Sequence, residues 1–87
     1  MHAVVVKVNI SDVEAAQKTL REEIVPRVSQ QPGFVHGYWM RKDNSGLSVT
    51  LYDSEDAAKQ ASERVPNNLA QAVTLEDVEV REVVAQA

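Results

Sequence analysis

Three hydroxyl-bearing residues alternate along a short segment near the middle of the chain. They are Ser48, Thr50 and Tyr52, within residues 46–53 (GLSVTLYD). Side chains of a β-strand point alternately to its two faces, so the three hydroxyls share one face. The opposite face of this strand is apolar and consists of Leu47, Val49 and Leu51. Since buried hydroxyls need hydrogen-bond partners, the stripe predicts a surface that orients a substrate, or one that pairs with waters or a second subunit.

His36 is the only histidine beyond the first residues of the chain. The ordinary pKa of histidine, about 6.5, suits a general base, which makes His36 the one catalytic candidate. The alternative interpretation is a hydrogen-bonded structural histidine on a strand.

Asn9 and Trp39 complete the set of candidates. Asn9 ends the first predicted strand, where it either holds a carbonyl or enolate or forms a turn. Trp39 supplies either the wall of a ligand pocket or the packing of a subunit interface. The candidate substrate-pocket residues are Asn9, Trp39, Thr50 and Tyr52.

Several classes of chemistry are supported by no motif in this sequence. The chain has no cysteine, which excludes disulfides and thiolate metal sites. No histidine and carboxylate spacing predicts a metal site, no glycine-rich loop predicts phosphate binding, and no Gly-X-Ser-X-Gly motif is present. We therefore expect no metal and no cofactor.

Charge and hydropathy exclude further partners. The formal net charge is -4, with acidic and basic residues mixed along the chain. This distribution argues against nucleic acid and anionic membranes as partners. The longest purely apolar run covers residues 3–6, far too short to span a bilayer. The first residues lack the features of a secretory signal, so we expect a cytoplasmic protein.

The elements that would position these residues follow from hydrophobic periodicity. Strands are predicted at residues 3–10, 34–41, 46–53 and 78–85. Ser11-Asp12 begins one helix, which Pro26 should kink or end near Glu22 or Glu23, with a shorter helical turn over residues 27–30. Residues 53–56 begin a second helix that ends at Pro66, and residues 69–75 are ambiguous between helix and loop.

This order predicts one ferredoxin-like domain over residues 1–87, an α+β fold of the type β-α-β-β-α-β. Right-handed crossovers place both helices on one face of a four-stranded antiparallel sheet. Pairing Lys42 with Leu47 in the hairpin puts His36, Tyr38 and Met40 on the apolar face, with Trp39 beside the hydroxyls. We expect the uncovered face to carry Val5, Trp39 and Tyr52, with Lys7 and Asn9 beside the hydroxyl stripe. An exposed apolar face predicts a homodimer.

The segments "VPRVSQQPGFVHGYWMR", "GLSVTLYDSEDAA" and "VEVREVVA" resemble the dimeric α/β-barrel superfamily, and within it the small proteins similar to antibiotic-biosynthesis monooxygenases. The resemblance covers nearly the whole chain and implies two paired sheets with a pocket in each subunit. Such monooxygenases oxidise aromatic substrates with dioxygen and without metal or flavin. Haem-degrading relatives need an iron-binding histidine, and residues 65–74 contain none.

Three functions remain open from the sequence. The first is a cofactor-independent, monooxygenase-like enzyme acting on an aromatic or enolisable small molecule, with His36 as its base. The second is a non-catalytic protein that binds a small hydrophobic or aromatic ligand. The third is a structural or stress-related homodimer whose interior is filled by its own side chains.

Overall fold

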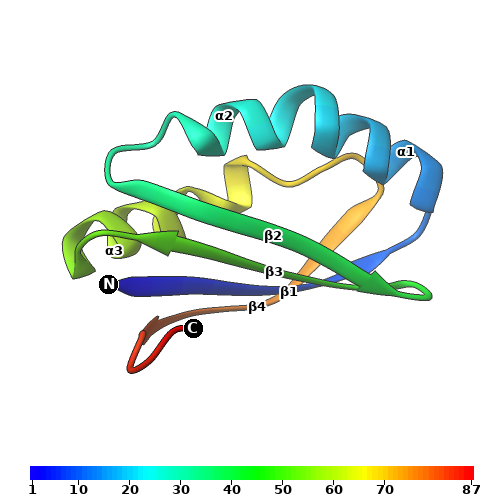
Figure 1. Cartoon of the computed structure of the whole chain (residues 1–87). Coiled ribbons are helices and arrows are strands. Elements are labelled where there is room, and N and C mark those ends of the chain that lie inside the picture. The colour runs from blue at the N-terminus through cyan, green and yellow to red at the C-terminus, as the bar shows by residue number, and fades with distance from the viewer.

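Four antiparallel strands and two helical segments account for almost the whole chain in the computed structural model, which describes all 87 residues (Figure 1). The elements are β1 (His2–Ile10), α1 (Val13–Thr19), the π-helical η1 (Leu20–Ile24), α2 (Val25–Ser29), β2 (Phe34–Lys42), β3 (Ser45–Tyr52), α3 (Glu55–Arg64), the 3₁₀ turn η2 (Val65–Asn67) and β4 (Val73–Glu82).

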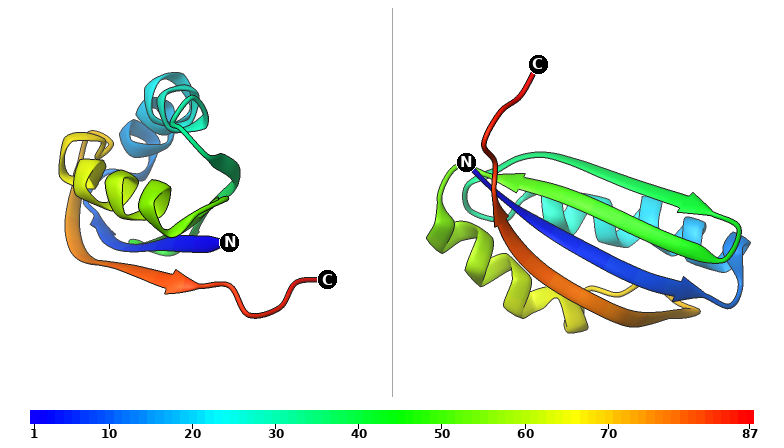
Figure 2. Two further views of the ribbon diagram at one scale, coloured as in Figure 1. Left: turned by 90° about the vertical axis from the view of Figure 1, so that its left-hand side faces the viewer. Right: turned by 90° about the horizontal axis from the view of Figure 1, so that it is seen from below.

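The strands form a single sheet in the order β2-β3-β1-β4. Both crossovers carry their helices to the same side of this sheet, and the sheet curves around them (Figure 2). The predicted ferredoxin-like fold is therefore confirmed. One face of the sheet lies under the helices, and the other face, called the open face below, is covered by no other element.

Both helical segments begin at the predicted capping residues. The Asp12 carboxylate accepts a hydrogen bond from the backbone N–H of Ala15 at 3.2 Å. The Ser54 hydroxyl accepts one from the backbone N–H of Ala57 at 3.1 Å. Each bond satisfies an N–H group that has no partner inside its helix.

The first helical segment does not end before Pro26, but it changes geometry around Glu22 and Glu23, where Pro26 was expected to kink or end it. Between Leu20 and Ile24 the helix widens to π geometry, and the N–H of Val25 donates to the carbonyl of Leu20, five residues earlier. Pro26 then falls in the first turn of α2, where a missing N–H costs little. The chain thus absorbs the proline with a wide turn, and the predicted helical turn after it is present.

The hairpin between β2 and β3 is displaced by two residues from the predicted pairing. Lys42 lies opposite Ser45, and Met40 lies opposite Leu47. A shift of two residues leaves every side chain on its predicted face, because the side chains of a strand repeat every two residues. Trp39 is therefore opposite Ser48, as the facing prediction requires.

The last strand begins five residues earlier than predicted and ends three residues earlier. A bulge opposite Lys7 and Val8 explains the error, because β4 shifts its register there. Leu75 before the bulge and Val78 after it both pack against the core, although they are an odd number of residues apart. The bulge therefore breaks the alternation that sequence analysis relies on.

The prediction of which residues lie on the open face was partly wrong. Tyr52, 1% exposed, and Thr50, 6% exposed, lie under the helices, where Tyr52 joins Val4 and Ala58 in the core. Trp39 lies on the same covered side. Val5 does lie on the open face, as predicted, but its neighbours there are the apolar stripe of β3 and not Trp39 or Tyr52. Sequence alternation separates two faces, but it does not say which one the crossover helices cover.

Candidate functional site

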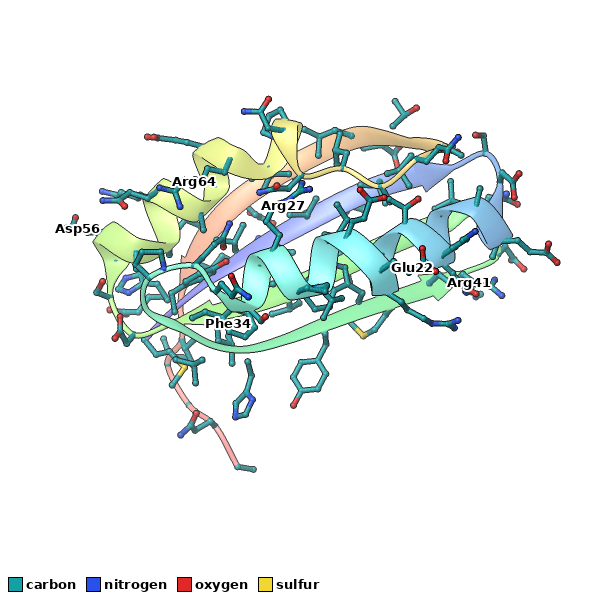
Figure 3. All side chains as sticks on the ribbon, turned by 90° about the horizontal axis from the view of Figure 1, so that it is seen from above. Glu22, Arg27, Phe34, Arg41, Asp56 and Arg64 are labelled. Carbon is teal, nitrogen blue, oxygen red and sulfur yellow. The ribbon has the colours of Figure 1, made fainter.

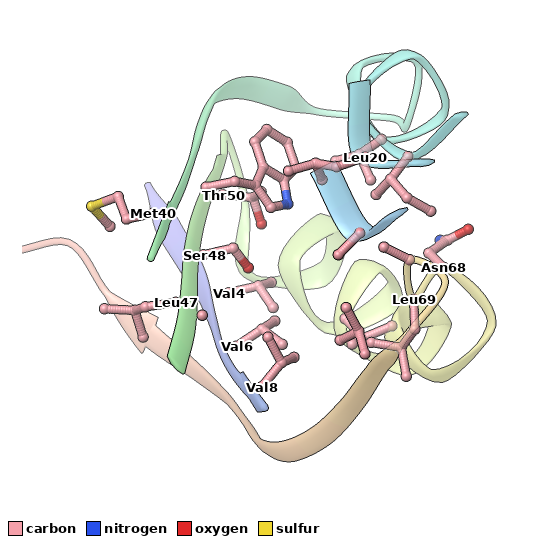
Figure 4. Close-up of a pocket in the computed structure, with 18 of the residues that line it drawn as sticks. Val4, Val6, Val8, Leu20, Met40, Leu47, Ser48, Thr50, Asn68 and Leu69 are labelled. Atoms are coloured by element: carbon pink, nitrogen blue, oxygen red, sulfur yellow. The ribbon is translucent and has the colours of Figure 1, made fainter. Parts of the chain in front are cut away.

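A cavity of about 160 Å³ lies between the covered face of the sheet and the helices. Figure 4 shows its arrangement: Val4, Val6 and Val8 of β1 form the floor, and Leu20 approaches from the helical side. Asn68 and Leu69, from the connection that leads to β4, form another wall. Of the 24 residues around the cavity, 17 are hydrophobic, so it favours an apolar occupant.

The hydroxyl stripe of β3 contributes to this cavity. Ser48 and Thr50 point from β3 toward the interior in Figure 4, whereas Met40 and Leu47 point to the other side of the sheet. Tyr52 also lines the cavity. The stripe predicted from the sequence is therefore a polar strip on an otherwise apolar wall.

Tyr52 is held in one orientation. Its hydroxyl donates a hydrogen bond to Gln31 Oε1 at 2.5 Å, and its ring meets that of Phe34 edge-on, with centroids 5.9 Å apart. Burial raises the pKa of Tyr52 above its ordinary value of 10.0, while the Thr50 hydroxyl and the charge of Arg64 act in the opposite direction. Tyr52 is thus a neutral hydrogen-bonding group at physiological pH.

Trp39 lines the cavity because Gly37 leaves room for its ring. A Cβ atom added at Gly37 would lie 3.0 Å from both Trp39 Cη2 and Trp39 Cζ3, and 3.2 Å from Thr50 Cγ2. The indole therefore lies over the glycine and beside Thr50. Glycine at position 37 is a packing requirement, since even a methyl group would press on the ring.

Asn9 does not lie beside the hydroxyl stripe, which corrects that prediction. Ile10 is buried among the covered residues, and its neighbour Asn9 points to the open face, where it is exposed. Lys7 is exposed on that face as well. The cavity therefore brings together three of the four predicted pocket residues, namely Trp39, Thr50 and Tyr52.

His36 lies on the open face of β2, opposite Leu51 of β3. It is exposed, and the sheet separates it from the cavity. A catalytic role for His36 stays a prediction, and it would belong to a site on the open face.

A polar groove adjoins the cavity and was missed in the sequence. Gln31 and Asn68 line both the cavity and the groove, and they mark the place where the two meet. Arg27 and Arg64 line the groove from α2 and α3 (Figure 3). Arg27 Nη1 donates to Asn68 Oδ1 at 3.0 Å across 41 positions of sequence. No local spacing could have indicated such a contact.

No known protein family matches the sequence, and no characterised protein is significantly similar to it. No three His, Cys, Asp or Glu side chains lie close enough together to hold a metal ion. No helix is long and apolar enough to cross a membrane.

Proposed function

We propose that this protein binds a small apolar molecule, with a single ring as the best-fitting shape, in the cavity between its sheet and helices. The main support for this proposal is a cavity of about 160 Å³ with a predominantly hydrophobic wall and a polar strip along one side. The apolar wall supplies affinity, and the hydroxyls of Ser48 and Thr50 supply orientation.

The volume limits the size of the occupant. An apolar cavity of about 150 Å³ holds one benzene molecule. A polycyclic ligand or haem needs several times that space and would have to separate the helices from the sheet. The cavity therefore favours a monocyclic ligand.

The chemistry of the wall favours binding over proton transfer. Its only titratable residues are Tyr52 and Arg41. Tyr52 stays protonated at neutral pH because burial raises its pKa. Arg41 is always charged, and its Nη1 donates to the carbonyl of Asp43 at 3.2 Å. Neither group is a general base.

Cofactor-independent oxygenation is the second candidate function, favoured by the meeting of Trp39, Thr50 and Tyr52 at one cavity. Without a base in the wall, the substrate would have to enter as a preformed enolate or phenolate. The substrate carbanion would transfer an electron to dioxygen in this water-poor site, and the two radicals would combine to form a C–O bond. The resulting peroxide would take up the remaining proton of that carbon and lose hydroxide, giving a quinone or diketone, while the Ser48 hydroxyl, which lines the cavity, would donate a hydrogen bond to the substrate oxygen. Oxygen consumption with an acidic phenol tests this function, and the Ser48→Ala variant should reduce the rate.

The open face supports a homodimer, which we propose as the assembled form within the dimeric α/β-barrel superfamily. Tyr38 is 60% exposed, Met40 48% and Leu47 38%, so three large apolar side chains lie together on β2 and β3. Lys7 of β1 lies opposite Leu47 at the border of this patch, and Glu79 and Arg81, which pair at 3.0 Å, lie farther across the sheet on β4. An apolar centre with a charged rim suits a second copy related by a two-fold axis.

Binding is tested by fluorescence of Trp39, the only tryptophan, during titration with toluene and phenol. Saturable changes with these ligands, but not with pyrene or haem after correction for absorbance, are the expected result. The Ser48→Leu variant fills the cavity and should abolish the change. Ser45→Leu places the same side chain at the exposed start of β3 and serves as the matched control.

A further inference from the structure

The polar groove beside the cavity has an unusual composition for this protein. It is lined by seven residues, none hydrophobic and none acidic: Arg27, Gln30, Gln31, Pro32, Arg64, Asn67 and Asn68. The chain as a whole carries 13 acidic and 9 basic residues. The groove is therefore a locally basic site on a protein of negative net charge.

In the groove, the side-chain oxygens of two amide residues already accept hydrogen bonds, so their NH₂ groups are what a ligand would meet. Gln31 Oε1 accepts the proton of Tyr52, and Asn68 Oδ1 accepts one from Arg27. With each amide oxygen occupied, the NH₂ group of each side chain remains to donate. These two amides stand where the groove meets the cavity.

The two guanidinium groups carry charge that no carboxylate neutralises. The ion pairs of the structure are His2–Glu55, Lys59–Glu55 and Arg81–Glu79, and none includes Arg27 or Arg64. Arg27 lies in the middle of α2 and Arg64 ends α3, so two elements far apart in sequence bring them to one groove (Figure 3). Paired arginines with amide donors form a typical carboxylate-binding arrangement.

We propose that the ligand is a monocyclic carboxylate whose ring occupies the cavity and whose carboxylate lies in the groove between Arg27 and Arg64. This proposal rests on the proposed binding function and extends it by specifying that the ligand carries a negative charge. Gln31 and Asn68 donate to the carboxylate at the junction. Arg41 lies at the hairpin end of the molecule, away from Arg27 and Arg64 (Figure 3), and its guanidinium donates to the carbonyl of Asp43 in the turn.

The test compares acids with their uncharged amides. Phenylacetate and phenylacetamide share a ring, as do 3-phenylpropionate and 3-phenylpropionamide, and Trp39 fluorescence reports the binding of each. We expect the better-fitting acid to bind about tenfold more tightly than its amide, because a charge-assisted hydrogen bond contributes more than a neutral one. The affinity of the acid should fall as salt is added, whereas that of the amide should not.

Variants locate the charge. Arg27→Gln and Arg64→Gln should each weaken acid binding roughly tenfold and leave amide binding unchanged. Arg21→Gln removes an exposed arginine that lines neither the cavity nor the groove, and as the matched control it should change neither affinity. Circular dichroism and thermal melting confirm that each variant is folded.

The outcomes separate this proposal from the binding function. If acid and amide bind equally, or if Arg21→Gln weakens the acid as much as the groove variants do, the carboxylate assignment is wrong while the cavity remains a binding site. If neither acid, amide nor toluene changes the fluorescence, the binding function itself fails.

Discussion

Both faces of the sheet carry apolar side chains, but they have different surroundings. On the covered face, Val4 and Tyr52 are each 1% exposed beneath the helices. On the open face, Tyr38 is 60% exposed. A tyrosine on one face is thus a core residue with a hydrogen-bonded hydroxyl, and a tyrosine on the other is a surface residue.

This difference shows that alternation along a strand tells which side chains share a face, but not which of the two faces the helices cover. The stripe of leucines and valines in β3 is the more hydrophobic one, yet the hydroxyl stripe is the one that the helices cover. The covered polar strip lines a cavity, and the apolar stripe on the open face is left without a covering element. The two proposed tasks, ligand binding and self-association, therefore fall on different faces of the sheet.

Replacing Tyr52 and Tyr38 with alanine, one at a time, should give the largest difference in stability between the two faces. Tyr52→Ala removes a fully buried ring and its bond to Gln31, and we expect it to lower the free energy of unfolding by about 3–5 kcal/mol. Tyr38→Ala should lower it by less than about 1 kcal/mol when the protein is dilute and monomeric. Urea unfolding measures both, and equal losses would contradict the assignment of the faces.

A charge on the open face should break the dimer without unfolding the subunit. Met40→Lys places an ammonium group within the apolar patch and should raise the dimer dissociation constant at least about tenfold. Sedimentation equilibrium measures the change, and Gln60→Lys on the exposed side of α3 is the matched control. A wild-type protein that stays monomeric at high concentration would refute self-association through this face.

A methyl group at Gly37 should disturb the cavity and leave the open face unaffected. Because its Cβ would press on the Trp39 ring and Thr50, we expect Gly37→Ala to cost about 1–3 kcal/mol and to shift the Trp39 emission. Toluene binding should weaken with it, while the dimer constant should not change. An unaltered emission spectrum would mean that the ring does not rest on Gly37.

The smallest effect concerns the Tyr52 hydroxyl at alkaline pH. The pKa of Tyr52 in the folded protein is raised above the ordinary value of 10.0, so the unfolded chain releases this proton first as the pH rises. Stability from Tyr52 is therefore fully present below pH 10 and is lost above it. Tyr52→Phe should be about 1 kcal/mol less stable than wild type at pH 7, and the gap should narrow above pH 10. A stability difference that widens above pH 10 would mean that folding lowers the pKa of Tyr52, contrary to this prediction.

Much of the fold could be predicted because its signals are local. The caps at Asp12 and Ser54 and the alternation in β3 each depend on a few neighbouring residues. The beginning of β4 could not be predicted, because the bulge near Glu76 shifts the alternation by one residue and only pairing with β1 reveals it. The hairpin register was off by two residues for the same reason, since turn length is decided by the paired strands.

The sequence by itself determined the order of the elements and the two faces of β1, β2 and β3, and three of its four candidate pocket residues line the cavity. Tertiary structure alone decided that Asn9 faces away from that cavity, and that Arg27, Gln31, Arg64 and Asn68 meet beside it. The physical reason is the range of the interactions. Capping and alternation act between residues a few positions apart, whereas the covered face and the groove come from crossovers that join residues about 40 positions apart.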